Sequence, residues 1–335
     1  MGKWSFTQYS KTPTGEIALV ELSKKQKTRQ GEYTKMLEVA AASVVANPQF
    51  SKYFVKESIG AVGGDILPAG NIEYGLCQAL HGEESAVAAF RSHYGRKKTK
   101  NLVLGIIAGN PGNIATPCGN CRDIMLEDLG RDFEIVSGAA DGGVAVVANM
   151  EQYLFENYEQ LPLPVEPMLY EKSWHAIVMG ESLVNDAYSP LLVRPERRYH
   201  AMIMTERNDF CGARDVMCEY HPIYALRDAI RQARRANDPF IEAVIIVCGD
   251  LGGMPPHVMY KDRQHLVELN LQQELLSGKE KNPPVYLFTY RNAVEITGVW
   301  KTSVKEWIPM VFTPRNFGEE FVKYLTTYFK SKISP

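Results

Sequence analysis

Two short runs of mostly apolar residues, Leu102–Ala108 and residues 241–247, are each followed by a loop rich in glycine and proline. Continuous apolar runs of this length are typical of strands that are buried on both faces of a sheet. A sheet of that kind needs helices packed on each of its sides. The two runs therefore predict a layered α/β fold.

Helical and strand-like patterns alternate around the first run. The expected elements are a helix over 31–48, a strand with a glycine turn over 59–67, a helix over 77–94, the strand 102–108, a helix over 121–129, and strands over 133–136 and 143–147. This order predicts a three-layer α/β/α sandwich.

The same order of elements begins again after residues 161–167, which contain three prolines in seven residues. The expected elements there are helices over 174–187, 218–235 and 261–276, and strands over 200–205, 241–247 and 285–289. A chain of 335 residues is long for one domain and sufficient for two. We therefore expect a duplicated sandwich, with domains 1–160 and 168–335 joined by the linker 161–167.

Composition and charge exclude several classes of protein. The formal net charge is −2, so we expect no general attraction for nucleic acid or an anionic membrane. No stretch approaches the roughly 20 apolar residues of a membrane-spanning helix, and residues 1–29 do not resemble a secretory signal. Six cysteines in a chain of this length indicate thiols or metal ligands in a reducing compartment. We expect a cytoplasmic protein.

Two short motifs carry the chemistry. The first is His81-Gly82-Glu83, and about 33 residues later comes Pro117-Cys118-Gly119-Asn120-Cys121. Zinc prefers nitrogen and sulfur ligands, and a catalytic site uses three of them and leaves a position for water. His81, Cys118 and Cys121 provide such a set. The two cysteines fall at the start of a predicted helix, where the positive end of the helix dipole favours thiolates.

Glu83 follows His81 by two residues, on the opening turn of its own helix, and can reach a water at the metal without binding the metal. It could accept a proton from that water and return protons to a substrate, as a general acid and base. The pair of motifs, H-x-E followed by P-C-x-x-C, is typical of zinc deaminases. A closed structural zinc site would need a fourth ligand, for which Cys77 is the nearby candidate.

On these residues the chain resembles the cytidine deaminase superfamily, and most closely the two-domain enzymes with a degenerate C-terminal copy; blasticidin-type deaminases are relatives. The resemblance implies that the backbone carbonyl of Thr116 receives the leaving amino group. It also implies that Arg122 hydrogen-bonds a ligand thiolate; an exposed helix arginine is the alternative.

The resemblance extends to residues that would contact a nucleoside. Asn71 and Glu73 match a segment that binds ribose hydroxyls and a ring edge, and Phe54 lies near an aromatic residue that packs on the base. Gly82 is included among these substrate contacts. Loop or capping roles for Asn71 and Glu73, and core packing for Phe54, remain open at this point.

The second half lacks a comparable set of metal ligands. In the sequence, Pro256-His257 and Tyr260 align with the Pro-Cys-x-x-Cys motif, and His221-Pro222-Ile223 aligns with His81-Gly82-Glu83. The matched copy lacks both cysteines and the glutamate. We expect a degenerate site there, so that the first domain alone carries the chemistry.

The leading hypothesis is a Zn²⁺-dependent hydrolytic deaminase that converts cytidine or deoxycytidine to the uracil nucleoside and ammonia. The alternative is a deaminase of a modified aminopyrimidine nucleoside or another small amino-heterocycle. A deaminase that edits nucleic acid is disfavoured by the net charge, and a non-catalytic zinc scaffold by Glu83. We expect a homodimer.

Overall fold

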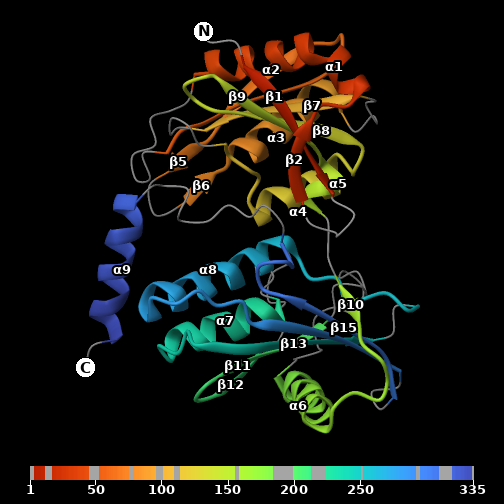
Figure 1. Ribbon diagram of the computed structural model, residues 1–335, viewed down its shortest axis with the longest axis vertical. Coiled ribbons are helices and arrows are strands. Elements are labelled where there is room, and N and C mark those ends of the chain that lie inside the picture. The colour runs from red at the N-terminus through yellow and green to blue at the C-terminus, as the bar shows by residue number, and fades with distance from the viewer. Residues whose placement is uncertain are drawn as a thin grey trace. The chain divides into compact units, whose positions relative to one another are not determined.

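The structure is a computed structural model, which describes residues 4–11, 17–44, 53–74, 78–95, 101–108, 114–154, 158–183, 199–212, 224–249, 252–291, 295–308 and 319–333. The chain divides into two compact units. The first unit is Met1–Phe155 with Pro309–Gly318, and the second is Glu156–Ile308 with Glu319–Pro335. Each unit is a mixed α/β structure, as the apolar runs predict (Figure 1).

A seven-stranded sheet forms the centre of the first unit, in the order β2-β1-β9-β8-β7-β3-β4. Its strands are β1 (Ser5–Lys11), β2 (Ile17–Glu21), β3 (Val55–Ala61), β4 (Ile66–Gly70), β7 (Leu102–Ala108), β8 (Phe133–Gly138) and β9 (Val144–Asn149). A two-stranded sheet of β5 (Ile72–Tyr74) and β6 (Gln78–Leu80) accompanies it. The helices are α1 (Lys24–Thr28), α2 (Gln30–Ala42), α3 (Gly82–Tyr94), α4 (Gly119–Asp128) and α5 (Met150–Tyr153).

Helices cover both faces of this sheet, with α2 on one face and α3 and α4 on the other (Figure 1). Along β3, alternate side chains point to the two opposite faces of the sheet. The side chains of Lys56 and Ser58 donate hydrogen bonds to carbonyl oxygens of α2, from Nζ to Ala41 at 2.9 Å and from Oγ to Met36 at 2.7 Å. Because successive strand residues point to opposite faces, Val55, Glu57 and Ile59 face α3.

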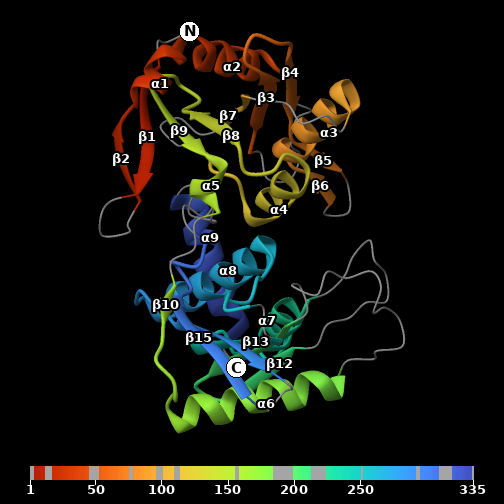
Figure 2. The same ribbon diagram turned by 90° about the vertical axis from the view of Figure 1, so that its right-hand side faces the viewer.

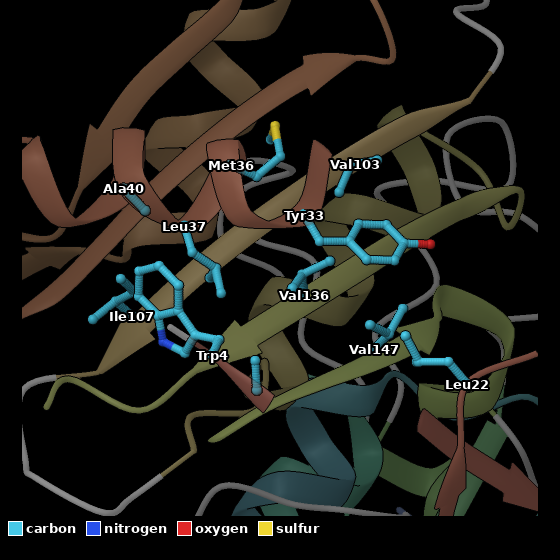
Figure 3. Packing of buried hydrophobic residues seen from close by; sticks show 11 residues of the cluster. Trp4, Leu22, Tyr33, Met36, Leu37, Ala40, Val103, Ile107, Val136 and Val147 are labelled. Atoms are coloured by element: carbon cyan, nitrogen blue, oxygen red, sulfur yellow. The ribbon is translucent and has the colours of Figure 1, made fainter. Parts of the chain in front are cut away.

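The core under α2 shows why that segment is helical. Tyr33, Met36, Leu37 and Ala40 are buried and lie at helical spacing, so they form one apolar face. This face packs on side chains of β7, β8 and β9 and on Trp4 (Figure 3). Burial of this cluster holds α2 against the sheet.

The second unit has a six-stranded sheet in the order β10-β15-β14-β13-β11-β12. Its strands are β10 (Glu159–Gln160), β11 (Tyr199–Thr205), β12 (Asp209–Gly212), β13 (Ile241–Gly249), β14 (Pro284–Arg291) and β15 (Glu295–Ser303), and its helices are α6 (Pro167–Leu183), α7 (Ala225–Arg235), α8 (Tyr260–Ser277) and α9 (Glu319–Ile333). α6 lies on one face of this sheet, and α7 and α8 lie on the other (Figure 2).

The two sheets share an order of strands and their directions. The series β4-β3-β7-β8-β9 pairs antiparallel, antiparallel, parallel and antiparallel. The series β12-β11-β13-β14-β15 pairs in the same four ways. α3 and α7 precede the strands β7 and β13, and α4 and α8 follow them.

Element boundaries differ from the sequence predictions at several places. The strand expected over 59–67 is two strands, β3 and β4, joined by the turn at its glycines. The helix expected over 77–94 begins at Gly82, because residues 78–80 pair with β5. The helix expected over 31–48 ends at Ala42, and residues 45–48 lie outside the described residues. β1 and β2 form an additional hairpin beyond β9 that the sequence did not predict (Figure 2).

Candidate metal centre and cavity

The predicted metal ligands meet at the first turns of two helices. His81 is the N-cap of α3 and Cys118 is the N-cap of α4, with Cys121 one turn further along. Nδ1 of His81 lies 3.3 Å from Sγ of Cys118 and 3.4 Å from Sγ of Cys121, and the two sulfur atoms are 3.5 Å apart. These three side chains form a group that could hold a metal ion.

Hydrogen bonds between the two helix starts fix the position of these ligands. Oε2 of Glu84 accepts a hydrogen bond of 2.8 Å from the backbone N–H of His81, which closes the first turn of α3. Oε1 of the same carboxylate accepts a hydrogen bond of 2.6 Å from Nδ2 of Asn120, which lies inside the Cys-x-x-Cys segment. Glu84 therefore joins the turn that carries the histidine to the turn that carries the cysteines.

Arg122 is fully buried directly after Cys121. Its Nε donates to the carbonyl oxygen of Pro117 at 2.9 Å, and one terminal nitrogen donates to that of Tyr153 at 2.8 Å. An exposed helix arginine, the alternative considered from the sequence, is therefore wrong. A hydrogen bond from Arg122 to a ligand thiolate stays a prediction.

Glu83 is placed beside the ligands and is 7% exposed. Its Oε2 lies 3.3 Å from Sγ of Cys121. Burial raises the pKa of the Glu83 carboxyl, and the nearby Cys118 thiolate adds to this effect. A carboxyl group with a raised pKa is suited to both accept and donate a proton near neutral pH.

A cavity of about 210 Å³ opens onto the ligands. Its described lining residues are Tyr53, Val55, Asn71, Glu73, Ala79, Leu80, His81, Gly82, Glu83, Ala115, Thr116 and Cys118. Mostly apolar walls with a few polar groups are typical of sites for small molecules. Four of the five predicted substrate contacts therefore lie at this cavity: Asn71, Glu73, Gly82 and Thr116.

Phe54, the fifth predicted contact, is not among these lining residues, and its neighbour Tyr53 is. Adjacent residues of an extended chain point in opposite directions, so an error of one position moves a side chain to the other face. Tyr53 and Val55 are two residues apart and both line the cavity, as the alternation of side chains along an extended chain requires.

The side chain of Asn71 is engaged with the backbone that leads into β3. Its Oδ1 accepts from the N–H of Val55 at 3.0 Å, and its Nδ2 donates to the carbonyl oxygen of Tyr53 at 2.8 Å. The turn role that was left open in the sequence is therefore present, and Asn71 holds two cavity residues in place.

The sequence motifs did not identify Glu57 as a residue of the site. It lies in the middle of β3, faces α3 and is 0% exposed. Burial raises the pKa of its carboxyl well above the usual value, and the neighbouring Glu83 contributes further. A carboxyl group at the centre of a buried strand is rare enough to draw attention, but its contact with Glu83 depends on the packing of α3 on β3.

The equivalent positions in the second unit can be identified from a buried arginine. Arg263 donates from Nε to the carbonyl oxygen of Val258 at 2.9 Å and from a terminal nitrogen to that of Trp307 at 3.1 Å, as Arg122 does in the first unit. Arg263 follows the N-cap of α8, Met259, by four residues, as Arg122 follows Cys118. Met259 therefore has the same place relative to Arg263 as Cys118 has relative to Arg122.

Asp262 stands directly before Arg263, as Cys121 stands directly before Arg122. This count differs by two residues from the pairing of His257 and Tyr260 with the two cysteines, which stays a prediction. The N-cap of α7 is Tyr224, and that of α3 is His81. His221, Cys77 and Cys218 lie outside the described residues.

Comparisons with known proteins give partial matches. No family model and no curated protein matches the chain. This chain is similar to solved cytidine deaminases over 36% of its length. The enzyme from Burkholderia pseudomallei has a TM-score of 0.32 and 19% identity, with 93% of its own chain covered. The enzyme from Mycobacterium leprae has a TM-score of 0.29, 24% identity and 96% coverage. The enzyme from Mycobacterium tuberculosis has a TM-score of 0.27 and 24% identity, with 89% of its own chain covered. At TM-scores of this size, we base the function of the site on its own residues.

None of the helices that the structure describes combines the length and apolar character needed to cross a membrane.

Proposed function

We propose that the first unit is a zinc-dependent hydrolytic deaminase that acts on a cytosine nucleoside. The observation that carries this proposal is the meeting of His81, Cys118 and Cys121 beside the buried carboxyl of Glu83, at a cavity with apolar walls. A structural metal site would have no use for such a carboxyl group or for the cavity.

The donor set supports zinc as the metal. Bonds of about 2.3 Å to sulfur and 2.0 Å to nitrogen in a tetrahedron imply donor–donor distances of about 3.5 to 3.8 Å. The three distances here are 3.3, 3.4 and 3.5 Å, so a small outward shift of the side chains would admit the ion. One imidazole and two thiolates suit zinc better than magnesium or calcium, which prefer oxygen.

Bound zinc would act as a Lewis acid that lowers the pKa of water at its open position. Glu83 is close enough to the ligands to accept a proton from the attacking water. The same carboxyl would then donate that proton to the ring nitrogen, accept a second proton from the hydroxyl group added to the ring carbon, and pass this second proton to the departing amine. Glu83 thus serves as base and acid in turn, which its burial favours.

The cavity walls support a flat ring as substrate. Val55, Leu80 and Ala115 provide apolar surface, and the Tyr53 ring lies at the same wall. Glu73 and Thr116 supply polar groups at the cavity, the latter with the carbonyl that the deaminase resemblance assigns to the leaving amino group.

The direct test is ammonia release from cytidine, deoxycytidine, cytosine and cytidine monophosphate, with zinc measured in the same samples. We expect turnover of a nucleoside at about one zinc per chain. Glu83→Gln should retain zinc and lose about 10²- to 10⁴-fold in kcat, the range for loss of a general acid–base. A zinc-loaded protein that releases no ammonia from any amino-heterocycle would contradict the proposal.

Asn71 gives a reason to keep a second substrate class. Because its amide already bonds the backbone at Tyr53 and Val55, it has less capacity left for ribose hydroxyls. A modified aminopyrimidine nucleoside or another small amino-heterocycle therefore remains the alternative substrate class. If cytidine and deoxycytidine stay intact while a modified analogue is consumed, the second class replaces the first.

We infer that the second unit is a degenerate copy of the first. The shared strand order and the matched bonds of Arg122 and Arg263 support a duplication. At the three ligand positions the copy has Tyr224, Met259 and Asp262, and the Asp262 carboxylate is paired with Arg227 at 2.8 Å. The homodimer, the cytoplasmic location, the absence of a nucleic-acid partner and the boundaries 1–160 and 168–335 stay predictions.

A further inference from the structure

Glu57 occupies a position where a charged side chain is costly. It pairs with Ala69 of β4 on one side and Ile106 of β7 on the other, so it lies inside the sheet. Its side chain points under the first turn of α3 and is fully buried. An ionised carboxylate there would need hydrogen-bond donors to offset its lost hydration.

Among the described residues, no N–H or O–H group donates a hydrogen bond to either oxygen of Glu57. The carboxyl group of Glu83, on the first turn of α3, is its neighbour. Two carboxylates can only accept hydrogen bonds, so this contact requires a proton on one of the two groups. Two buried carboxyl groups side by side share a proton for the same reason, because both cannot ionise.

The residue between His81 and Glu83 is fitted to this arrangement. A Cβ atom on Gly82 would lie 2.5 Å from Oε1 and 2.9 Å from the carboxyl carbon of Glu57. The glycine therefore makes room for the Glu57 carboxyl directly beneath the turn that carries Glu83. In the second unit the first residue of α7 is Ala225, and Ala201 and Ile203 of β11 offer no carboxyl group.

We propose that Glu57 is a positioning residue: as a neutral acid, it donates a hydrogen bond to the Glu83 carboxylate and holds it in the orientation needed for proton transfer. This inference rests on the proposed deaminase function. Glu57 then holds the Glu83 carboxylate from below α3 before substrate enters.

The kinetic test compares Glu57→Gln with Glu57→Leu in the zinc-loaded, full-length protein. Glutamine keeps a donor at nearly the same place, so kcat should stay within about threefold of the wild type. Leucine fills the space but cannot donate, and we expect kcat to fall by about 10- to 100-fold, with KM and zinc content nearly unchanged. Equal kcat values for the glutamine and leucine variants would overturn the proposal.

A second measurement does not depend on turnover. Infrared difference spectra of the zinc-loaded protein at neutral pH should contain the carbonyl stretch of a protonated carboxylic acid that disappears in Glu57→Gln. If that band is absent from the wild type, Glu57 is not a neutral donor and the proposal fails. A wild type that shows the band and releases no ammonia from any substrate would instead contradict the proposed function.

Discussion

The three predicted metal ligands hold their protons differently when no metal is bound. The hydrogen bond to Cys118 raises the pKa of His81 to about 9. The bond with Cys121, and then His81, lowers the pKa of Cys118 well below its usual range. Burial raises the pKa of Cys121 well above its usual value. At neutral pH the metal-free site therefore contains an imidazolium, one thiolate and one thiol.

Zinc binding at pH 7 should release about two protons, one from His81 and one from Cys121, because metal ligands must be deprotonated. The apparent affinity should rise with pH, and the release should fall towards one proton as the pH passes about 9. Isothermal titration calorimetry in buffers of different ionisation enthalpy measures this number. His265→Gln, in the second unit, is the control and should not change it. Release of no protons at pH 7 would contradict the assignment.

Gly82 and Glu57 form a coupled pair that can be tested by stability alone. Gly82→Ala should destabilise the metal-free protein by about 1 to 3 kcal/mol, because the added methyl group meets the buried carboxyl. In the Glu57→Ala protein, where this carboxyl group is absent, Gly82→Ala should lower the free energy of unfolding by a smaller amount. Urea unfolding of the four proteins gives the coupling energy. If Gly82→Ala lowers the free energy of unfolding equally with and without Glu57, the Glu57 carboxyl does not restrict the residue at position 82.

At the scale of elements, each unit uses one buried arginine to fasten a helix start to a distant segment. Arg122 joins the loop before α4 to the end of α5, and its guanidinium lies 5.3 Å from the centre of the Tyr153 ring. Arg263 does the same for α8, with Tyr260 and Trp307 as its aromatic neighbours. The first of these arginines follows Cys121, a candidate metal ligand, and the second follows Asp262.

Replacing either arginine by methionine leaves two buried carbonyl groups without a charged donor. Each change should destabilise its own unit by about 2 to 4 kcal/mol. Arg122→Met should also weaken zinc retention, because the Cys-x-x-Cys turn loses its anchor. Arg263→Met is the matched control and should retain zinc. Unfolding curves and zinc content measured together decide this, and equal zinc loss in both variants would contradict a local role for Arg122.

At the scale of the whole molecule, the described residues of the first unit contain a candidate metal site, and those of the second unit contain a buried ion pair at the start of α8. Tyr199 donates a hydrogen bond of 3.1 Å to the Asp262 carboxylate, whose other oxygen is 2.8 Å from the Arg227 guanidinium. Tyr199 and Arg227 hold the fully buried side chain of Asp262, and the Arg227 guanidinium offsets its charge. The second unit should therefore be indifferent to chelators.

Removal of zinc should lower the unfolding temperature of the first unit and leave that of the second unchanged, because a bound metal stabilises only the part that binds it. Differential scanning calorimetry with and without chelator measures both transitions. Arg263→Met identifies the second transition, since it lowers that one alone. Equal shifts of both transitions on chelation would contradict a single metal site in the first unit.

Much of the fold and site followed from local patterns. The helices over 82–94, 119–128, 225–235 and 260–277 and the strands over 102–108 and 241–249 lie where apolar periodicity predicted them. The β1–β2 hairpin and the short β5–β6 pair were missed, because such strands depend on partners distant in the chain.

The sequence by itself predicted that His81, Cys118, Cys121 and Glu83 would lie together, because these residues belong to two short motifs at helix starts. Within one helical turn, spacing alone decides which side chains can converge. Tertiary structure alone decided the place of Glu57 and the presence of Tyr53, rather than Phe54, among the residues that line the cavity. These positions depend on which face of a strand packs against a helix. A shift of one residue along a strand moves a side chain to the opposite face.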